Sequence, residues 1–151
     1  MEVQTVRVSK DKYYLNIANA VSERSTCLRR RYGAIIVKDD IIVATGYNGS
    51  ARGEVNCCDS GQCERERQGI AQGQRYDLCV AVHAEQNAII QAGFAKTKGA
   101  TLYLSGNDTK GNLIEKPRPC EICMRFIKNA GIAKVVCDDG SEIHTITMKG
   151  E

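Results

Sequence analysis

Apolar and polar positions follow two different periods along the chain, and these periods predict helices and strands in turn. Apolar residues recur every three to four positions over residues 11–25, which is typical of an amphipathic helix. Two short apolar runs follow at residues 33–37 and 41–45, separated by the turn residues Asp39-Asp40. We therefore expect a helix that is followed by a β-hairpin.

The second half of the chain also contains segments with a helical period and segments typical of strands. Residues 83–92 repeat with a helical period, and Asp139-Gly140 is a strong hairpin-turn signal. The further predicted elements are a strand at 100–104, a polar loop at 106–118, a helix from Pro119 to near Gly131, and strands at 133–137 and 143–148. Because so short a turn joins the last two strands, the final strand is predicted to be antiparallel.

The resulting order, α-β-β-α-β-α-β-β, predicts one α/β domain over residues 1–151. Its centre is expected to be a mixed five-stranded sheet flanked by helices. Residues from about 50 to 80 interrupt the pattern, because glycine, cysteine and charged residues dominate there and no period holds. We call this segment the cysteine-rich insertion. We expect it to be rich in loops that a metal ion could organise, since long structureless loops are uncommon in compact domains.

The composition is typical of a globular protein, with 42% apolar and 26% charged residues. No apolar run approaches the roughly 20 residues that a membrane helix needs, and residues 1–10 lack the apolar core of a signal peptide. We therefore expect a soluble cytoplasmic protein that does not bind membranes.

The charge of the chain bears on its partners. A net charge of +3 is too small to indicate nucleic acid as a partner. Arg29, Arg30 and Arg31 nevertheless form a basic cluster. We interpret this cluster as a solvated helix end, where cations suit the helix dipole, and an anionic small ligand is the alternative.

Eight cysteines and only two histidines narrow the candidate chemistry. A disulfide scaffold is typical of small secreted chains, whereas clustered cysteines in a cytosolic protein more often indicate metal. Two motifs carry this prediction, each at the start of a predicted helix: His83-Ala84-Glu85, and P-C-E-I-C from Pro119 to Cys123. The positive end of a helix favours the thiolate form of cysteine, which is the form that binds metal.

One imidazole and two thiolates suit a catalytic zinc ion, because three protein ligands leave a fourth position open for water. His83, Cys120 and Cys123 are therefore predicted to bind Zn2+. Glu85 is predicted to be the catalytic residue that moves protons, and the backbone N–H of Ala84 to hold the carbonyl oxygen of a base. The alternative, a structural zinc site, normally has four protein ligands and gives Glu85 no role.

These motifs have a known counterpart, since H-x-E followed by P-C-x-x-C is the signature of zinc deaminases. Over nearly its full length the chain resembles the deoxycytidylate (dCMP) deaminases of the cytidine deaminase superfamily. The segments R-S-T-C, from Arg24 to Cys27, and T-G-Y-N-G-S, from Thr45 to Ser50, resemble the dCMP branch in particular. The resemblance implies a cytidine deaminase-like fold and hydrolytic deamination of dCMP to dUMP with release of ammonia. It also implies a homo-oligomer and regulation by dCTP and dTTP.

The resemblance also implies residues that bind the substrate. It places Asn48 near the sugar of the nucleotide, and Arg24, Ser25 and Thr26 near its phosphate. For Asn48 the alternative is an ordinary Asn-Gly turn. For Arg24 and Thr26 the alternatives are a helix-end charge and a helix cap.

Relatives with a cysteine-rich insertion can hold a second, structural zinc ion in it. The thiols available here are those of Cys57, Cys58, Cys63 and Cys79. Free thiols, or a site that uses only three of these four, are the alternatives. Cys27 and Cys137 are interpreted as buried small residues.

Other functions fit parts of the sequence. A deaminase of this kind could act on another cytosine nucleotide or nucleoside, or on adenosine in tRNA, although a tRNA substrate requires a basic face. A zinc-organised binding module without catalysis would need the ligands but not Glu85. A thiol redox protein would use Cys120 and Cys123 and leave the H-A-E motif without a role.

Overall fold

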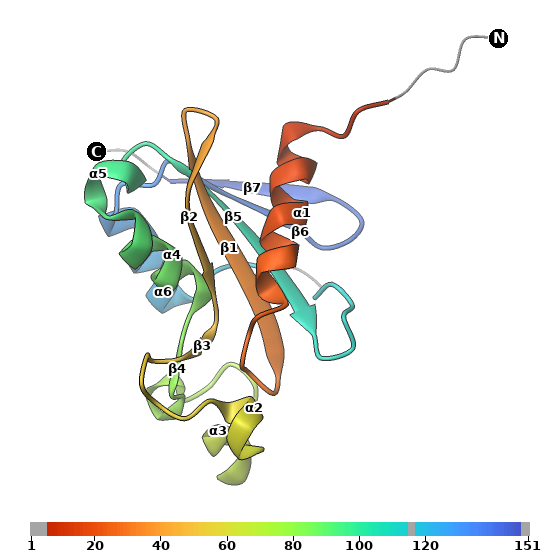
Figure 1. Cartoon of the computed structure of the whole chain (residues 1–151), viewed down its shortest axis with the longest axis vertical. Helices are drawn as coiled ribbons and strands as arrows, with labels where there is room; N and C mark the ends of the chain where they lie inside the picture. The colour runs from red at the N-terminus through yellow and green to blue at the C-terminus, as the bar shows by residue number, and fades with distance from the viewer. Residues whose placement is uncertain (1–5, 115–116, 149–151) are drawn as a thin grey trace, which may run out of the picture.

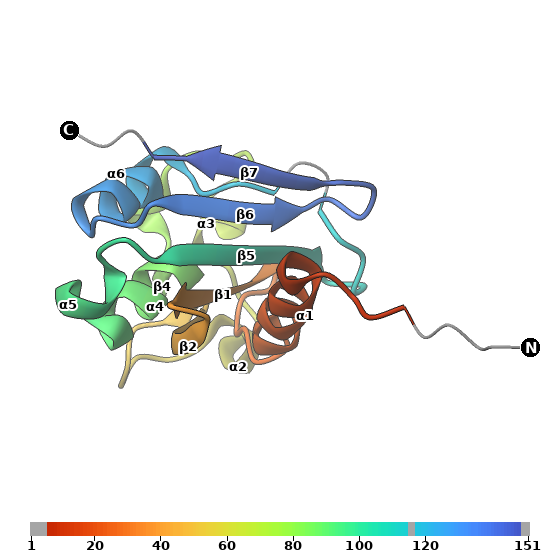
Figure 2. The same cartoon turned by 90° about the horizontal axis from the view of Figure 1, so that it is seen from above.

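The computed structural model describes residues 6–114 and 117–148 of the chain. Its centre is a five-stranded sheet with the order β2-β1-β5-β6-β7 (Figure 1), and Figure 2 shows these strands side by side. The strands are β1 (Arg30–Lys38), β2 (Ile41–Tyr47), β5 (Thr101–Asp108), β6 (Lys134–Asp138) and β7 (Ile143–Thr147). The helices around the sheet are α1 (Lys10–Ser22), α4 (Ala84–Ala92), α5 (Phe94–Thr97) and α6 (Glu121–Asn129). Within the described ranges, no helix has the length and apolar character needed to cross a membrane.

The sheet is mixed, as the sequence predicts. β1 pairs antiparallel with both β2 and β5, and β6 pairs antiparallel with β7. β5 and β6 are parallel, because the chain returns through α6 before it enters β6. The prediction of an antiparallel final strand is confirmed, since the turn at Asp139-Gly140 leads directly from β6 into β7.

Helices cover both faces of the sheet, because successive side chains of a strand point to opposite faces. In β1, Ala34 and Ile36 belong to the core shared with α4 and α6, whereas Ile35 and Val37 belong to the core shared with α1. Figure 1 shows α1 on one side of the strands and α4 and α6 on the other. The unbroken apolar run at residues 33–37 thus reflects a strand that is buried on both faces.

One glycine lets α4 approach the sheet closely. A Cβ atom at Gly46 in β2 would collide with the backbone oxygen of Ala84 and the backbone nitrogen of Ala88, both in α4. A larger residue at this position would therefore push the helix away from the sheet. Gly46 thus fixes the position of the first turns of α4, where the predicted catalytic residue lies.

The cysteine-rich insertion lies beyond one end of the sheet (Figure 1). The short strands β3 (Gly49–Ser50) and β4 (Ala81–Val82) pair with each other and so join its two ends. Between them the insertion contains the short helices α2 (Cys57–Ser60), α3 (Glu64–Arg67) and η1 (Tyr76–Leu78). The sequence predicts loops here and misses the β3-β4 pair, because two-residue strands give no periodic signal.

Some element boundaries differ from the prediction. α1 ends at Ser22, and β1 begins at Arg30, three residues before the predicted strand. The interpretation of the basic cluster as a helix end is therefore wrong, since Arg30 and Arg31 belong to a strand. β1 is longer than its apolar run because it pairs with β5 as far as Asp108. This pairing also takes the first residues of the predicted loop 106–118 into β5, and residues 115–116 of that loop lie outside the described residues.

Candidate zinc centre and substrate pocket

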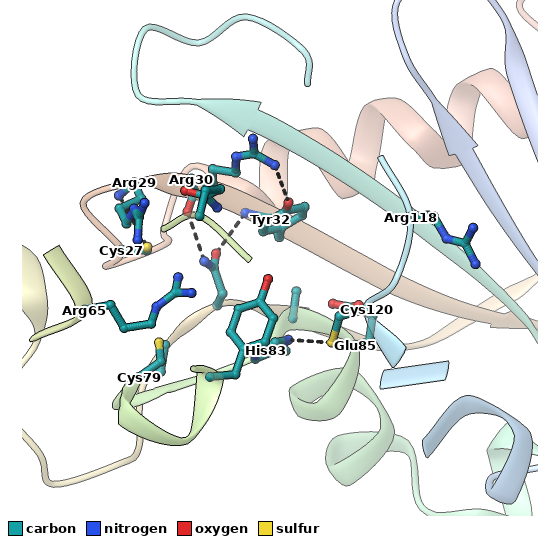
Figure 3. A pocket seen from close by; sticks show the side chains of 15 residues that line it. Cys27, Arg29, Arg30, Tyr32, Arg65, Cys79, His83, Glu85, Arg118 and Cys120 are labelled. Carbon is teal, nitrogen blue, oxygen red and sulfur yellow. Dashed lines mark hydrogen bonds between the residues drawn. The ribbon is translucent and has the colours of Figure 1, made fainter. Parts of the chain in front are cut away.

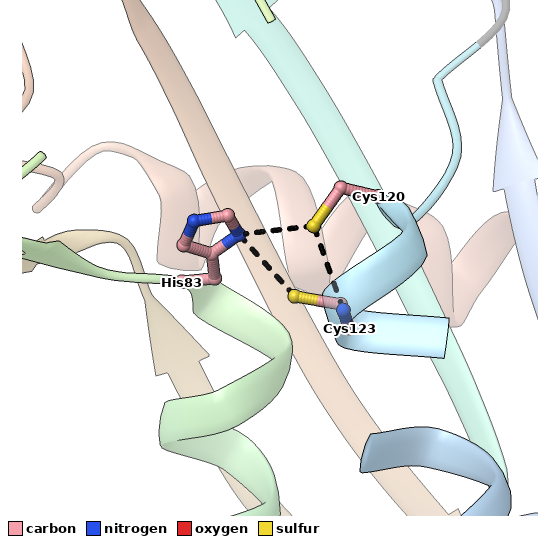
Figure 4. A group of neighbouring side chains, drawn as sticks. All are labelled: His83, Cys120 and Cys123. Carbon is pink, nitrogen blue, oxygen red and sulfur yellow. Dashed lines mark hydrogen bonds between the residues drawn. The ribbon is translucent and has the colours of Figure 1, made fainter. Parts of the chain in front are cut away.

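The starts of two helices bring the candidate metal ligands together. His83 is the N-cap residue of α4 and Cys120 is the N-cap residue of α6. Cys123 follows Cys120 by three positions, which places the two sulfur atoms on one side of the first turn of α6. Figure 4 shows His83 facing both cysteines across the gap between the two helices. The motif spacing and the packing of α4 beside α6 therefore create a single site.

The distances within this group fit a zinc ion. His83 Nδ1 lies 3.6 Å from Cys120 Sγ and 3.2 Å from Cys123 Sγ. A tetrahedral ion with bonds of about 2.3 Å to sulfur and about 2.0 Å to nitrogen would hold such atoms about 3.5 Å apart. Within residues 6–114 and 117–148, this is the one group of His, Cys, Asp and Glu residues whose ligand atoms all lie within 4.8 Å of one another. Three protein ligands leave the open position that a catalytic zinc site requires.

The electrostatics of the group also favour metal binding. A hydrogen bond from the Cys123 thiol and, to a lesser extent, one with His83 lower the pKa of Cys120 to about 4. Together these contacts outweigh burial, which raises the pKa. The same contact raises the pKa of Cys123, because its proton is held against the Cys120 thiolate. Contact with Cys120 is also the main cause that raises the pKa of His83. These contacts favour the thiolate form of Cys120, which is the form that binds zinc.

Glu85 is a buried carboxyl group beside these ligands. It lies in the first turn of α4, and only 4% of its surface is exposed. Burial raises the pKa of Glu85, and hydrogen bonding to the backbone and the charge of His83 oppose this shift. A raised pKa makes a carboxylate a stronger base, and such carboxyl groups are typical of general acid–base catalysis. Glu85 therefore has the position and the electrostatics of a general acid–base residue.

A cavity of about 90 Å³ opens next to this group (Figure 3). His83, Ala84, Glu85 and Cys120 form one part of its wall, and we call this part the scaffold wall. The rest of the wall is polar and basic, and it includes Arg29, Arg30, Tyr32, Asn48, Arg65 and Tyr76. The cavity thus combines a proton-transfer group and candidate metal ligands with several arginines.

Asn48 lies in the wall of this cavity, with 7% of its surface exposed. Its Oδ1 accepts hydrogen bonds from the Ser25 hydroxyl at 2.6 Å and from the Tyr32 backbone N–H at 2.8 Å. Its Nδ2 donates to the Arg30 carbonyl at 3.0 Å. Asn48 therefore ties the start of β1 to the segment after α1. An amide carries two N–H groups, so one remains for a ligand.

The predicted phosphate-binding residues Arg24, Ser25 and Thr26 are not among the residues that line the cavity. Ser25 supports Asn48 from behind, and the Thr26 N–H donates to the Asn48 carbonyl at 3.2 Å. Arg24 is exposed just after α1, so a helix-end charge describes its position better. Ser25 and Thr26 therefore help to position the wall of the cavity without facing its interior.

Two residues of the cavity wall, Arg65 and Tyr76, had no signal in the sequence. Both lie in the cysteine-rich insertion, where no period indicates which way a side chain points. Arg29 did have a signal, because it belongs to the basic cluster at residues 29–31. Its place in the cavity wall fits the anionic-ligand alternative.

The insertion cysteines lie near one another without forming a compact ligand set. All eight cysteines of the chain are free thiols. Burial raises the pKa of Cys57, and the charges of Cys27, Cys63, Cys79 and Cys58 raise it further, so these thiols lie near one another. Cys58 is exposed. A second zinc ion at Cys57, Cys58, Cys63 and Cys79 thus stays a prediction.

The two cysteines outside both predicted zinc sites differ in burial. Cys137 is buried, as expected. Cys27 is only half-buried and lines the cavity, so its interpretation as a buried small residue is wrong. Its place follows from the turn between α1 and β1, which brings it against the insertion.

Comparison with known proteins assigns the family. The family described as "Cytidine and deoxycytidylate deaminase zinc-binding region" matches residues 8–138. The chain belongs to this deaminase family. The match to a zinc-binding region, together with the His/Cys/Cys geometry, shows that the chain has a catalytic zinc site. The alternative of a thiol redox protein is therefore set aside.

Individual relatives agree with this assignment. The deoxycytidylate deaminase of Mycobacterium phage D29 is 37% identical over 131 residues, which cover 83% of this chain and 91% of the relative. The deoxycytidylate deaminase of Schizosaccharomyces pombe is also 37% identical over 131 residues, which cover 86% of this chain and 37% of the relative. The chain therefore spans less than two-fifths of the length of this fungal relative.

A solved structure confirms the fold. The dCMP deaminase from the cyanophage S-TIM5, in complex with dCMP and dUMP, aligns with a TM-score of 0.59 at 29% identity. The alignment covers 87% of this chain and 83% of that chain. The predicted fold class, a cytidine deaminase-like mixed five-stranded sheet flanked by helices, is thus confirmed.

Proposed function

We propose that the chain catalyses the zinc-dependent hydrolytic deamination of dCMP to dUMP. The reaction adds one water molecule to the cytosine ring and releases one ammonia molecule. The observation that carries the proposal is the buried carboxyl group of Glu85 beside the His/Cys/Cys group, at the wall of an arginine-lined cavity. Relatives named deoxycytidylate deaminase, and a structural neighbour in complex with dCMP and dUMP, support the choice of substrate.

In this mechanism, His83, Cys120 and Cys123 hold the zinc ion. Zinc bound at such a site acts as a Lewis acid that lowers the pKa of water to about 7. Glu85 takes one proton from the attacking water and delivers it to the ring nitrogen. It then moves the second proton of that water, from the new hydroxyl group on the ring carbon to the amine, which leaves as ammonia. The backbone N–H of Ala84 donates to the carbonyl oxygen of the base and so orients the ring. Burial of Glu85 suits both proton transfers, because it raises the pKa of the carboxyl group and so makes the carboxylate a stronger base.

The polar wall of the cavity suits a nucleotide. The free N–H of the Asn48 amide is available to the sugar, in line with the role that the resemblance implies for this residue. Arginine side chains suit the phosphate, because their planar N–H groups bind its oxygens in pairs. Ser25 and Thr26 act on the substrate through Asn48, which they hold in place.

The same proposal covers the organisation of the protein. We infer that residues 1–151 form one deaminase domain with a cysteine-rich insertion at about 50–80, because strands from before and after the insertion belong to one sheet. A homo-oligomer, a cytoplasmic location, and dCTP or dTTP as effectors are further predictions from the family resemblance. Neither a membrane nor a nucleic acid is expected as a partner.

The test is ammonia release from dCMP, CMP, dCTP and deoxycytidine by the zinc-loaded protein. We expect dCMP to be the preferred substrate. We expect Glu85→Gln to lower kcat by about 10²- to 10⁴-fold, the range for loss of a general acid–base group, with zinc content unchanged. Glu121→Gln is the matched control, because Glu121 is also in the first turn of its helix but is exposed.

The alternatives give different results in the same assay. Preference for another cytosine compound would keep the mechanism and change the substrate. Deamination of adenosine in tRNA alone would replace the cytosine substrate altogether. No release from any substrate, with binding of nucleotides unaffected by Glu85→Gln, would indicate a zinc-organised binding module.

A further inference from the structure

Arg65 is the buried arginine of the cysteine-rich insertion. It lies in the short helix α3, and only 5% of its surface is exposed. Two other basic residues of the insertion differ from it: Arg67, in the same helix, and Arg75, before η1, are exposed and pair with Glu64 and Asp77. A buried arginine needs partners for its charge and its N–H groups, because removing an unpaired charge from water is costly.

The partners of Arg65 within the described residues satisfy only part of its guanidinium group. One Nη1 N–H donates to the Gln74 carbonyl at 2.9 Å, and the guanidinium carbon lies 4.7 Å from the centre of the Tyr76 ring. Nε is buried and has no hydrogen-bond partner, and none of the salt bridges among these residues involves Arg65. The charge is thus held by a carbonyl and an aromatic ring, and neither of them carries a negative charge.

The side chain of Arg65 is directed into the cavity. Figure 3 shows it reaching from the insertion toward the middle of the cavity, whereas Arg118 points away. Arg29 lies in the same wall and is in a similar state, because its Nε pairs with Glu66 at 3.2 Å while its buried Nη1 has no partner. Two guanidinium groups with unpaired buried N–H groups in one wall are suited to an anion with several acceptor oxygens.

The position of this wall relative to the metal ligands limits what the anion can belong to. The ring of Tyr76 contacts both Arg65 and His83: the Arg65 guanidinium is over its face, and its centre is 5.3 Å from that of the His83 ring, which it meets edge-on. A ligand whose reacting ring is at His83 therefore reaches Arg65 with a group attached elsewhere on the molecule. In a nucleotide, that group is the phosphate on the sugar.

We propose that Arg65 binds the 5′-phosphate of the substrate, and that the cysteine-rich insertion thereby selects nucleotides over nucleosides. This assignment rests on the proposed function, because that function supplies the reaction. The phosphate contact itself can be tested without any turnover. The phosphate oxygens accept hydrogen bonds from the guanidinium groups of Arg65 and Arg29. The carbonyl of Gln74 and the ring of Tyr76 hold the guanidinium group of Arg65 in place before the ligand enters, which lowers the entropic cost of binding.

The test compares dCMP with deoxycytidine, which lacks the phosphate, using the zinc-loaded full chain. We expect Arg65→Gln to lower kcat/KM for dCMP by about 10- to 100-fold, the range for losing a charge-assisted hydrogen bond, mainly through KM. The kcat/KM for deoxycytidine should change by less than about threefold. Arg65→Lys keeps the charge but not the planar set of donors, so it should lie between the wild type and Arg65→Gln.

Arg67→Gln is the matched control, because Arg67 lies two residues further in the same helix and is exposed. It should leave both substrates unaffected. An equal loss for dCMP and deoxycytidine in both Arg65 variants would overturn the proposal, because a purely structural role affects every substrate alike. Equal kcat/KM values for dCMP and deoxycytidine in the wild-type protein would also overturn the proposal.

Calorimetric binding of dUMP and deoxyuridine separates this proposal from the proposed function, since it requires no turnover. Tighter binding of dUMP than of deoxyuridine, with the difference removed by Arg65→Gln, would support the phosphate contact even if no ammonia is released from any substrate. Equal binding of the two compounds, or no binding of either, would overturn the contact. Deamination of dCMP that Arg65→Gln leaves unchanged would keep the proposed function and reject only the role of Arg65.

Discussion

The two sides of the cavity are built in different ways. The scaffold wall comes from the starts of α4 and α6, and both helices are packed on the sheet. The insertion contributes Arg65 and Tyr76 from elements of four and three residues, and we call this side the insertion wall. Ala84 and Ala88 of α4 are fully buried, whereas α2, α3 and η1 bury no apolar residue.

This difference in packing corresponds to a difference in task. Chemistry at the metal needs atoms held to within a fraction of an ångström, and a core packed on a sheet provides that rigidity. Recognition of a substrate group can come from a segment with few buried contacts, provided that local partners fix the side chain. The fold therefore places the reaction on the scaffold wall and allows specificity to change with the insertion.

The largest effect should follow from a change at the packing of the scaffold wall. In Gly46→Ala, the new Cβ atom collides with the backbone of α4 at Ala84 and Ala88, so the helix must move. We expect a loss of about 3 kcal/mol in the free energy of unfolding, at the upper end for overpacking, and a lower kcat because Glu85 moves with the helix. Urea unfolding and steady-state kinetics measure the two effects.

Gly69→Ala provides the comparison within the insertion. Gly69 has a φ of +71°, and a Cβ atom added there would have no other heavy atom within 4 Å, so the only cost is backbone strain of about 1 kcal/mol. Equal losses of stability in the two variants would contradict the distinction between a packed scaffold wall and a loosely packed insertion wall.

A second prediction concerns the metal of the insertion. Cys57 has Cys27, Cys63, Cys79 and Cys58 as neighbours, and among these Cys58 alone is exposed. We expect the purified chain to contain two zinc ions, Cys57→Ser to contain one, and Cys58→Ser to keep both. Loss of the structural ion should make trypsin cleavage after the exposed Arg67 and Arg75 about tenfold faster, which corresponds to about 1.4 kcal/mol of local stability.

Metal analysis of the three proteins decides this prediction. One zinc ion in the wild type, with no change in Cys57→Ser, would show that the insertion holds itself together without metal. Loss of an ion in Cys58→Ser would instead favour the set of Cys57, Cys58, Cys63 and Cys79.

The smallest effect is expected far from both walls. Tyr14 of α1 donates a hydrogen bond to the Asp40 carboxylate at 2.5 Å, and this bond raises the pKa of Tyr14 to about 12. The usual value for tyrosine is about 10. Because the folded-state pKa is the higher one, the stabilisation is fully present below pH 10 and is lost as the pH rises toward 12.

Tyr14→Phe should therefore lower the free energy of unfolding by about 1 kcal/mol at pH 7 and leave kcat unchanged. The difference from the wild type should shrink above pH 10. Tyr13→Phe is the control, since Tyr13 is its neighbour in sequence and is half-exposed. A difference that persists undiminished up to pH 12 would show that the Tyr14 hydroxyl is not the titrating group.

The sequence alone predicted the order of the three longer helices and the five strands of the central sheet, the mixed sheet with its antiparallel last strand, and the two motifs that supply the zinc ligands and Glu85. These features depend on local information. Apolar periods reveal buried faces, Asp139-Gly140 specifies a tight turn, and motif spacing within one helical turn fixes where two thiols point. The family motifs then connected His83 with Cys120 across a separation that no local pattern spans.

Only the tertiary structure decided which residues share the cavity. It left Arg24, Ser25 and Thr26 out of the cavity lining, and it brought Arg65 and Tyr76 into it. In a segment without a period, the direction of a side chain depends on long-range contacts. Here these are the β3-β4 pair that joins the ends of the insertion and the ion pair from Glu66 to Arg29. Such contacts form only when distant parts of the chain pack together, so the chemistry could be read from the sequence while the wall that recognises the substrate could not.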